Sequence, residues 1–182
     1  MADWSDQTRR AVLAMAAGTL AATVALPAAA AWRPIGARTV ALDNLHTGER
    51  LRAPFWENGR YVPDALARFN WLLRDFRTDE VRAIDPGVFD LLWHLQRRLR
   101  APAGFQVLSG YRSPATNAML AATTDGVAQH SLHMRGMAID IRVPGRSLVK
   151  VHRAAIALGL GGVGYYPRSD FVHLDVGRVR RW

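Results

Sequence analysis

Two stretches of the chain decide the fold, Met137-Ala138-Ile139-Asp140-Ile141-Arg142-Val143 and Asp170-Phe171-Val172-His173-Leu174-Asp175-Val176. In both, apolar residues occupy every second position, which is the pattern of a strand with one buried face. The side chains of Asp140, His173 and Asp175 then lie on the face away from the core. A carboxylate on a half-buried strand is unfavourable unless it is paired or binds a metal, so this face is a candidate functional site.

The rest of the chain alternates strands, turns and helices. Alternating apolar residues predict strands around Val40–Leu42, over Leu51–Trp56 and around Phe105–Val107, and Asn58-Gly59 predicts a tight turn. An apolar stripe at helical spacing, Leu66, Phe69, Leu73 and Phe76, predicts one helix. Capping residues and prolines predict three more, which run from the N-cap Asp85 and Pro86 through Leu99, from Pro114 to about Ala122, and from the N-cap Ser147 to Leu158.

A glycine cluster lies between the last predicted helix and the last predicted strand. Gly159, Gly161, Gly162 and Gly164 predict a tight connection there. Because the helices come early and the strands late, we expect an α+β fold in which helices pack on a small, mainly antiparallel sheet.

A metal site is predicted by the joint placement of two histidines and a carboxylate. His133 precedes Asp140 by seven residues, on a loop that can fold back beside it, and Gly136 and Ala138 are small where another segment must approach. With His173 these residues form three ligands and leave a fourth position open, which is typical of catalytic rather than structural zinc. The chain has no cysteine, so cysteine-ligated zinc is excluded.

The spacing of these residues resembles a known family. The pattern S-x-H-x-x-G-x-A-x-D spans Ser131–Asp140, and an acidic residue, two apolar residues and His follow at Asp170–His173. This combination is similar to the signature of the zinc D,D-peptidases, which have a Hedgehog/D,D-peptidase-type fold and include murein endopeptidases. Ser109-Gly110-Tyr111-Arg112-Ser113 also resembles the arginine motif of that family.

A narrower resemblance covers nearly the whole chain after the N-terminal segment. The stretches Leu45–Glu49, Gly164–Arg168 and Gly177–Trp182 are similar to an exported, YcbK-type branch of the zinc D,D-peptidases. That branch is associated with murein endopeptidase activity, so the resemblance implies an enzyme that hydrolyses peptidoglycan.

The resemblance implies a role for each residue of the site. The implied zinc ligands are His133, Asp140 and His173. Arg112 would bind a substrate carboxylate or stabilise the oxyanion of the tetrahedral intermediate. Ser131 and Tyr165 are the other candidate substrate-binding residues.

Two carboxylates compete for the role of general base. Relatives place an acidic residue three positions before the last histidine ligand, which is Asp170 here. Asp175 is the rival because it shares the strand face of His173; otherwise it orients the imidazole of that ligand. Asp170 has the opposite parity and reaches the site only if the chain turns at Pro167–Ser169. Between the two, we favour Asp170 as the base.

The N-terminus indicates export of a single domain. Arg9-Arg10 precede a weakly apolar run, Ala11–Leu26, and the small residues Ala28–Ala31 that a signal peptidase reads. We therefore expect a twin-arginine signal over residues 1–30 and one zinc peptidase domain over residues 31–182.

The function that fits these features is a periplasmic, zinc-dependent murein endopeptidase. We expect hydrolysis of an amide bond in the cross-links between stem peptides, with 3-3 (diaminopimelate–diaminopimelate) links favoured over 4-3 links. The alternatives are a zinc-stabilised domain that binds peptidoglycan without cutting it, and a D,D- or L,D-carboxypeptidase.

The net charge of +9 suits an anionic partner. Charge is the one feature that would favour nucleic-acid binding, and the sequence contains no recognised nucleic-acid-binding motif, so nucleic acid is not an expected partner. The expected partners are stem peptides and, during export, the twin-arginine translocase, and we expect a monomer.

Replacement of Arg9 and Arg10 by lysine is expected to leave the chain unprocessed in the cytoplasm, because the twin-arginine route reads the arginine pair. Cell fractionation and the mass of the accumulated chain measure this, with Arg33→Lys, outside the predicted signal, as the control. Normal periplasmic processing of the double-lysine variant would refute the export route.

Overall fold

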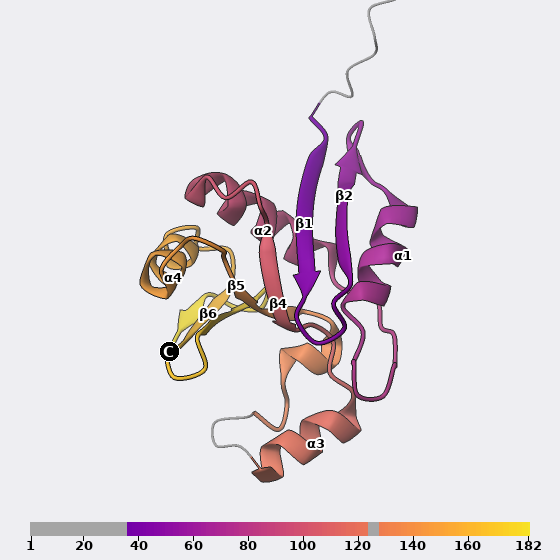
Figure 1. Ribbon diagram of the computed structural model, residues 1–182, viewed down its shortest axis with the longest axis vertical. Coiled ribbons are helices and arrows are strands. Elements are labelled where there is room, and N and C mark those ends of the chain that lie inside the picture. The colour runs from indigo at the N-terminus through magenta and orange to yellow at the C-terminus, as the bar shows by residue number, and fades with distance from the viewer. Residues whose placement is uncertain (1–35, 124–127) are drawn as a thin grey trace, which may run out of the picture. The chain divides into compact units, whose positions relative to one another are not determined.

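The strands of the computed structural model, which describes residues 36–123 and 128–182, form one open sheet (Figure 1). They are β1 (Arg38–Asn44), β2 (Arg50–Glu57), β3 (Arg60–Tyr61), β4 (Phe105–Ser109), β5 (Ala138–Arg142), β6 (Gly162–Tyr166), β7 (Phe171–Asp175) and β8 (Arg180–Arg181). Their order in the sheet is β3-β2-β1-β4-β5-β7-β6-β8. Neighbouring strands are antiparallel except that β1 and β4, and β6 and β8, are parallel.

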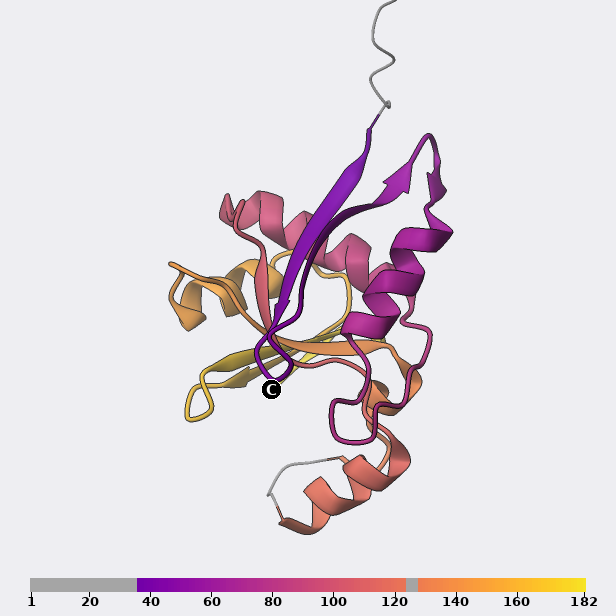
Figure 2. The same ribbon diagram turned by 45° about the vertical axis from the view of Figure 1, so that its right-hand side comes forward.

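Most of the helices in the described residues pack against this sheet. They are α1 (Pro63–Leu72), α2 (Pro86–Leu99), α3 (Pro114–Thr123), α4 (Leu148–Ile156) and the short 3-10 helix η1 (Leu132–Arg135). α1 contacts β2, α2 contacts β1, and α4 contacts β6 and β7, whereas α3 projects away from the sheet in both views (Figures 1 and 2). The predicted α+β fold with helices on a mainly antiparallel sheet is therefore confirmed.

The expected signal over residues 1–30 lies outside the described residues, so it stays a prediction, as does the boundary of the domain over residues 31–182. Within residues 36–123 and 128–182, none of the helices has both the length and the apolar composition that a membrane span requires.

Local sequence signals set most helix starts. The Asp85 side chain accepts a hydrogen bond from the Gly87 backbone N–H at 2.9 Å, and Pro86 occupies the first turn of α2, as predicted. Ser147 precedes α4 as predicted, although its side chain makes no capping hydrogen bond.

The predicted helical stripe from Leu66 to Phe76 extends too far, because α1 ends at Leu72. Other segments bind the backbone at this point: the Leu72 carbonyl accepts from the Asn44 side chain at 2.8 Å, and the Leu73 carbonyl accepts from the Tyr111 N–H at 2.8 Å. These tertiary hydrogen bonds satisfy the helix end. Phe76 lies beyond it and stacks on His46 at a ring separation of 3.9 Å.

The glycine cluster is not wholly a connection, since Gly162 and Gly164 lie inside β6 and pair with Asp175 and His173 of β7. A Cβ atom at Gly162 would overlap the Asp175 carboxylate, and one at Gly164 would lie 2.8 Å from the Trp182 ring. Glycine occupies this strand because other side chains pass close over it, and that packing is tertiary information.

Gly136 is the glycine on which the turn after η1 depends. Its φ is +67°, and a Cβ there would overlap the Ala83 carbonyl oxygen, whereas Gly145 has a similar φ of +70° and open space around it. We expect Gly136→Ala to lower the free energy of unfolding by about 2–5 kcal/mol, and Gly145→Ala by about 1 kcal/mol, because only the first adds a clash to the backbone strain. Denaturant unfolding measures both. Equal losses would show that the clash relaxes without cost.

Candidate metal centre

The register of three adjacent strands brings two of the predicted ligands together. Asp140 of β5 pairs with His173 of β7 on one side and with Ser109 of β4 on the other. A register irregularity between Val107 and Ser109 ends the regular pairing of β4 just before that contact. Because Asp140 and His173 are directly opposite in this register, their side chains share one face of the sheet, as predicted, and both are buried.

The 3-10 helix η1 supplies His133. Its N-cap is Ser131, whose hydroxyl oxygen accepts from the His133 N–H at 3.3 Å, and its last turn is closed by Gly136. The His133 carbonyl in turn accepts from the Arg112 N–H at 3.3 Å. Ser131, predicted as a substrate-binding residue, therefore has a capping role as well as a place on the cavity wall.

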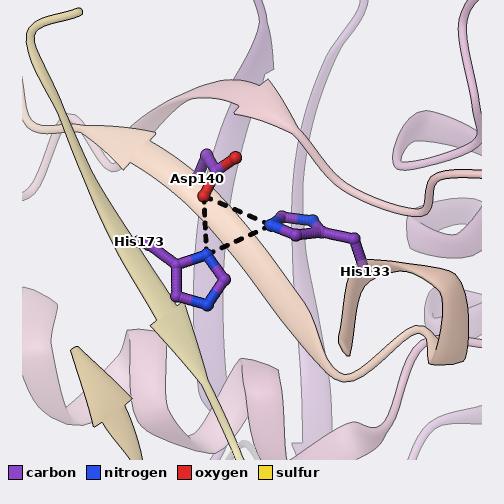
Figure 3. Close-up of side chains that lie close together, drawn as sticks. All are labelled: His133, Asp140 and His173. Carbon is purple, nitrogen blue, oxygen red and sulfur yellow. Dashed lines mark hydrogen bonds and ion pairs between the residues drawn. The ribbon is translucent and has the colours of Figure 1, made fainter. Parts of the chain in front are cut away.

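The donor atoms of the three residues form a small triangle (Figure 3). His133 Nε2 lies 3.1 Å from His173 Nδ1 and 3.3 Å from Asp140 Oδ1, and His173 Nδ1 lies 2.8 Å from Asp140 Oδ1. Tetrahedral zinc with bonds of about 2.0–2.1 Å places its ligand atoms about 3.3 Å apart. The triangle is therefore of the size that zinc requires, and its nitrogen and oxygen donors suit that metal.

Hydrogen bonds on the far side of each ring orient the donor atoms. His133 Nδ1 lies 2.7 Å from the Gly110 carbonyl oxygen, which can only accept, so Nδ1 carries the proton and Nε2 presents a lone pair. His173 Nε2 lies 3.1 Å from Asp175 Oδ2, which likewise places a proton on Nε2 and turns Nδ1 toward the triangle. Partners of this kind set ring orientation and tautomer in metal sites.

The electrostatics of the cluster are compatible with metal binding. Burial would raise the pKa of Asp140, but His133 and His173 outweigh burial and hold it below its usual range. Burial lowers the pKa of His133, so that ring is neutral. Burial also opposes protonation of His173, yet its hydrogen bonds to Asp140 and Asp175 raise its pKa to about 9. A metal would therefore displace a proton from His173 at neutral pH.

Arg112 lies against the same carboxylate. Its Nη2 atom is 3.5 Å from Asp140 Oδ2 and donates to the Ser109 hydroxyl at 3.2 Å. The loop that carries it is held by Asp75, a buried carboxylate that accepts from the Ser113 N–H at 2.8 Å. Burial lowers the pKa of Arg112, but a guanidinium stays charged at any physiological pH. Arg112 thus presents a fixed positive charge beside the triangle.

Asp175 is enclosed by donors. Its Oδ1 accepts from Gly162 N–H, Gly177 N–H and Arg180 Nη1 at 3.2, 2.8 and 3.0 Å, and its Oδ2 accepts from His173 Nε2 and Arg180 Nη2 at 3.1 and 2.7 Å. Burial would raise its pKa, but these donors lower it. Five donors occupy the lone pairs that a base would need, so the geometry favours the orienting role for Asp175.

The Asp170 carboxylate contacts Arg142 and does not line the cavity over the triangle. It lies in the turn before β7 with a φ of +51°, and its Oδ2 lies 3.2 Å from Arg142 Nε. Its side chain is 65% exposed and is not part of the cavity wall, although its neighbours Ser169 and Phe171 are. The chain does turn at Pro167–Ser169, but the turn directs the carboxylate to Arg142.

The cavity over the triangle has a volume of about 410 Å³. Besides the three predicted ligands and Arg112, its wall includes His130, Ser131, Leu132, Tyr166, Ser169, Phe171, Arg180 and Trp182. The cavity therefore combines two guanidinium groups with an aromatic side.

Comparisons with known proteins bear on this geometry. The family described as Peptidoglycan L,D-endopeptidase MepK matches residues 33–182. Peptidoglycan L,D-endopeptidase MepK of Escherichia coli K12 is 42% identical over 181 residues, which are 99% of this chain and 100% of that protein. The chain belongs to the MepK family. The probable peptidoglycan L,D-endopeptidase MepK of Haemophilus influenzae is also 42% identical, over 80% of this chain and 78% of its own length. No solved structure matches.

Membership of the MepK family confirms the resemblance to the murein endopeptidase branch and the prediction of a peptidase. One residue of the predicted site is misplaced. Tyr165 does not line the cavity; it faces α4, where its ring lies 4.8 Å from that of His152. Strand parity explains the error, because Tyr165 pairs with core-facing Val172 whereas Tyr166 pairs with Phe171 on the site face.

The sequence analysis missed Arg180 and Trp182 in the cavity of this MepK-family chain. Both lie in the basic segment after β7, where charge alone indicates solvent exposure. Arg180 instead forms a two-point ion pair with Asp175, and the Trp182 ring lies 5.3 Å from that of His173. The sequence does carry one signal, because Arg180 follows the strand carboxylate Asp175 by five residues. That spacing alone does not distinguish a buried ion pair from a surface pair.

His133→Ala and His173→Ala are each expected to abolish stoichiometric zinc binding, because two donors do not complete a tetrahedral zinc site. His130→Ala is the matched control, since it removes a cavity histidine outside the triangle. Metal content after dialysis against a weak chelator measures the effect. Tight zinc retention by either triangle variant would show that its histidine is not a ligand.

Proposed function

We propose that this chain is an exported, zinc-dependent peptidoglycan endopeptidase that hydrolyses an amide bond in the cross-links between stem peptides. We propose further that it prefers 3-3 links to 4-3 links. The observation that carries the proposal is the buried triangle of His133, Asp140 and His173 beneath an arginine-lined cavity in a MepK-family chain. A 3-3 link joins an L centre of one diaminopimelate to a D centre of the next, whereas a 4-3 link joins two D centres. The L,D-endopeptidase name of the relatives supports the first.

The residues of the site divide the chemistry between them. Zinc held by the triangle would supply an acidified water and a Lewis acid for the scissile carbonyl. Arg112 donates hydrogen bonds to the carbonyl oxygen as negative charge develops on it, or holds a neighbouring substrate carboxylate. Asp175 keeps the His173 ring in its tautomer throughout, because Arg180 holds that carboxylate in place.

Asp170 is the proposed base. It accepts a proton as the water oxygen attacks the carbonyl carbon, and it returns a proton to the amine nitrogen as the C–N bond breaks. Its side chain is exposed in a turn whose neighbours, Ser169 and Phe171, line the cavity. The proposal requires that the carboxylate leave Arg142 for the site during turnover. Asp175 lacks this freedom because all its lone pairs accept hydrogen bonds.

The proposed setting is the periplasm, where the stem peptides are found. The paired arginines and the cleavage-type sequence support export by the twin-arginine translocase. The net charge of +9 and the two cavity arginines suit a substrate rich in carboxylates. We propose that the chain acts as a monomer, which light scattering of the purified protein tests.

One observation favours a second candidate function, a zinc-stabilised domain that binds peptidoglycan without hydrolysis. Asp170 contacts Arg142 and Asp175 is saturated with donors, so each carboxylate near the triangle has another partner. The deciding assay incubates the purified chain with defined 3-3 and 4-3 cross-linked muropeptides and with uncross-linked stem peptides, with and without chelator. Binding without cleavage would support the second function. Release of a terminal residue alone would indicate a carboxypeptidase.

In this assay, zinc-saturated Asp170→Asn is expected to lose about 10²–10⁴-fold in turnover, because it removes the base. Asp175→Asn is expected to lose about 10–100-fold in zinc affinity, because it weakens the orientation of His173. Asp79→Asn, another exposed aspartate paired with an arginine, is the control. If Asp170→Asn turns over within a few-fold of the parent, Asp170 is not the base.

A further inference from the structure

One side of the cavity is built from three aromatic rings. Tyr166 and Phe171 stack with their ring centroids 4.5 Å apart and their planes 14° apart. Trp182 lies beside His173 and donates its indole N–H to the Tyr166 hydroxyl oxygen at 2.8 Å. All three rings line the same cavity as the metal triangle. Neither Tyr166 nor Trp182 has a role in the mechanism given above.

The backbone is adapted to this arrangement. Gly164 pairs with His173, and a Cβ atom on it would lie 2.8 Å from both the Trp182 and the Tyr166 rings. The Trp182 backbone makes two hydrogen bonds with β6. Its N–H donates to the Val163 carbonyl at 3.2 Å, and its carbonyl accepts from the Tyr165 N–H at 3.0 Å. The indole is therefore held over β6 at the place where the Tyr166 hydroxyl lies.

The hydrogen bond from Trp182 determines what the Tyr166 hydroxyl can do. An indole N–H can only donate, so the phenolic oxygen accepts and its own proton must point in another direction. Within residues 36–123 and 128–182, the structure gives this hydroxyl Trp182 as its hydrogen-bonding partner. A hydroxyl that already accepts a hydrogen bond is also a stronger donor. The proton of the Tyr166 hydroxyl therefore remains available for a second hydrogen bond, and Tyr166 lines the cavity.

Donors of this kind accelerate amide hydrolysis. Negative charge develops on the carbonyl oxygen, and each preorganised donor contributes to the rate. Arg112 also contacts Asp140 and Ser109, and the other cavity guanidinium, Arg180, is held by Asp175 at two points. Tyr166 carries a neutral donor whose other hydrogen bond keeps it in place.

We propose that Tyr166 is a further catalytic residue, which donates a hydrogen bond to the oxygen of the scissile carbonyl, and that Trp182 is the positioning residue that aims and strengthens this donor. The phenol keeps its proton throughout, so no bond forms or breaks at Tyr166. The inference rests on the proposed peptidoglycan endopeptidase function.

The test compares steady-state kinetics of zinc-loaded variants on the cross-linked muropeptide that the parent cleaves fastest. Tyr166→Phe keeps the ring stacked on Phe171 and removes only the hydroxyl. Its kcat is expected to fall about 10²–10³-fold with KM within a few-fold, which is the loss seen when one oxyanion donor is removed. Tyr165→Phe is the matched control, because it removes the neighbouring hydroxyl on the opposite face and is expected to keep the parent kcat.

Trp182→Phe keeps an aromatic ring and removes the indole N–H. It is expected to lower kcat about 10-fold in the parent and to have no further effect in the Tyr166→Phe background, because its action passes through the hydroxyl. Zinc content is measured for every variant, so that loss of metal is not mistaken for loss of the donor. Equal effects of Trp182→Phe in both backgrounds would overturn its positioning role.

Two failures are distinguishable. A zinc-loaded parent that cleaves none of the muropeptides overturns the proposed function. A parent that cleaves, together with a Tyr166→Phe variant whose kcat is within threefold of it, overturns the catalytic role of Tyr166 and leaves the proposed function in place.

Discussion

The pairing of β5 with β7 is the constraint on which the rest of the site depends. Asp140 faces His173 in this register, and the adjacent pair, Ile139 and Leu174, is buried on the core side. A shift by one residue would exchange the two faces and bury a carboxylate and an imidazole in the apolar core. The alternation that builds the core therefore also aligns these two candidate ligands, and no separate interaction is needed to bring their side chains together.

The third candidate ligand, His133, is positioned differently because it is not on a strand. Two features hold it: the short helix η1, closed by Ser131 and Gly136, and the Gly110 carbonyl that binds the far side of its ring. Gly110 is packed so closely on the end of α1 that a Cβ atom there would lie 2.5 Å from the Leu73 carbonyl oxygen. The ligand geometry is thus coupled to a helix far away in the sequence.

Much of this could be predicted from the sequence, and the limits have physical causes. Strand parity placed Asp140, His173 and Asp175 on one face because period-two patterns depend only on local alternation. The same rule could not be applied to Tyr165, because β6 begins at Gly162 and a glycine-rich segment carries no strand signal of its own. The direction of Asp170 follows from a positive φ in a turn of ordinary residues, which no pattern encodes.

Asp140 and Asp175 show that burial and pKa alone do not define the role of a carboxylate. Both are buried, both contact His173 and an arginine, and neighbouring positive groups lower the pKa of both. They differ in the donors that surround them. Asp175 receives five N–H groups on its two oxygens, including both arms of Arg180, so it has no capacity left for a metal or a proton. Among the residues that the structure describes, the contacts of Asp140 Oδ1 are the two imidazole nitrogens that would themselves bind the metal. The number of fixed donors around each carboxylate, rather than its depth in the protein, therefore separates the candidate ligand from the group proposed to orient it.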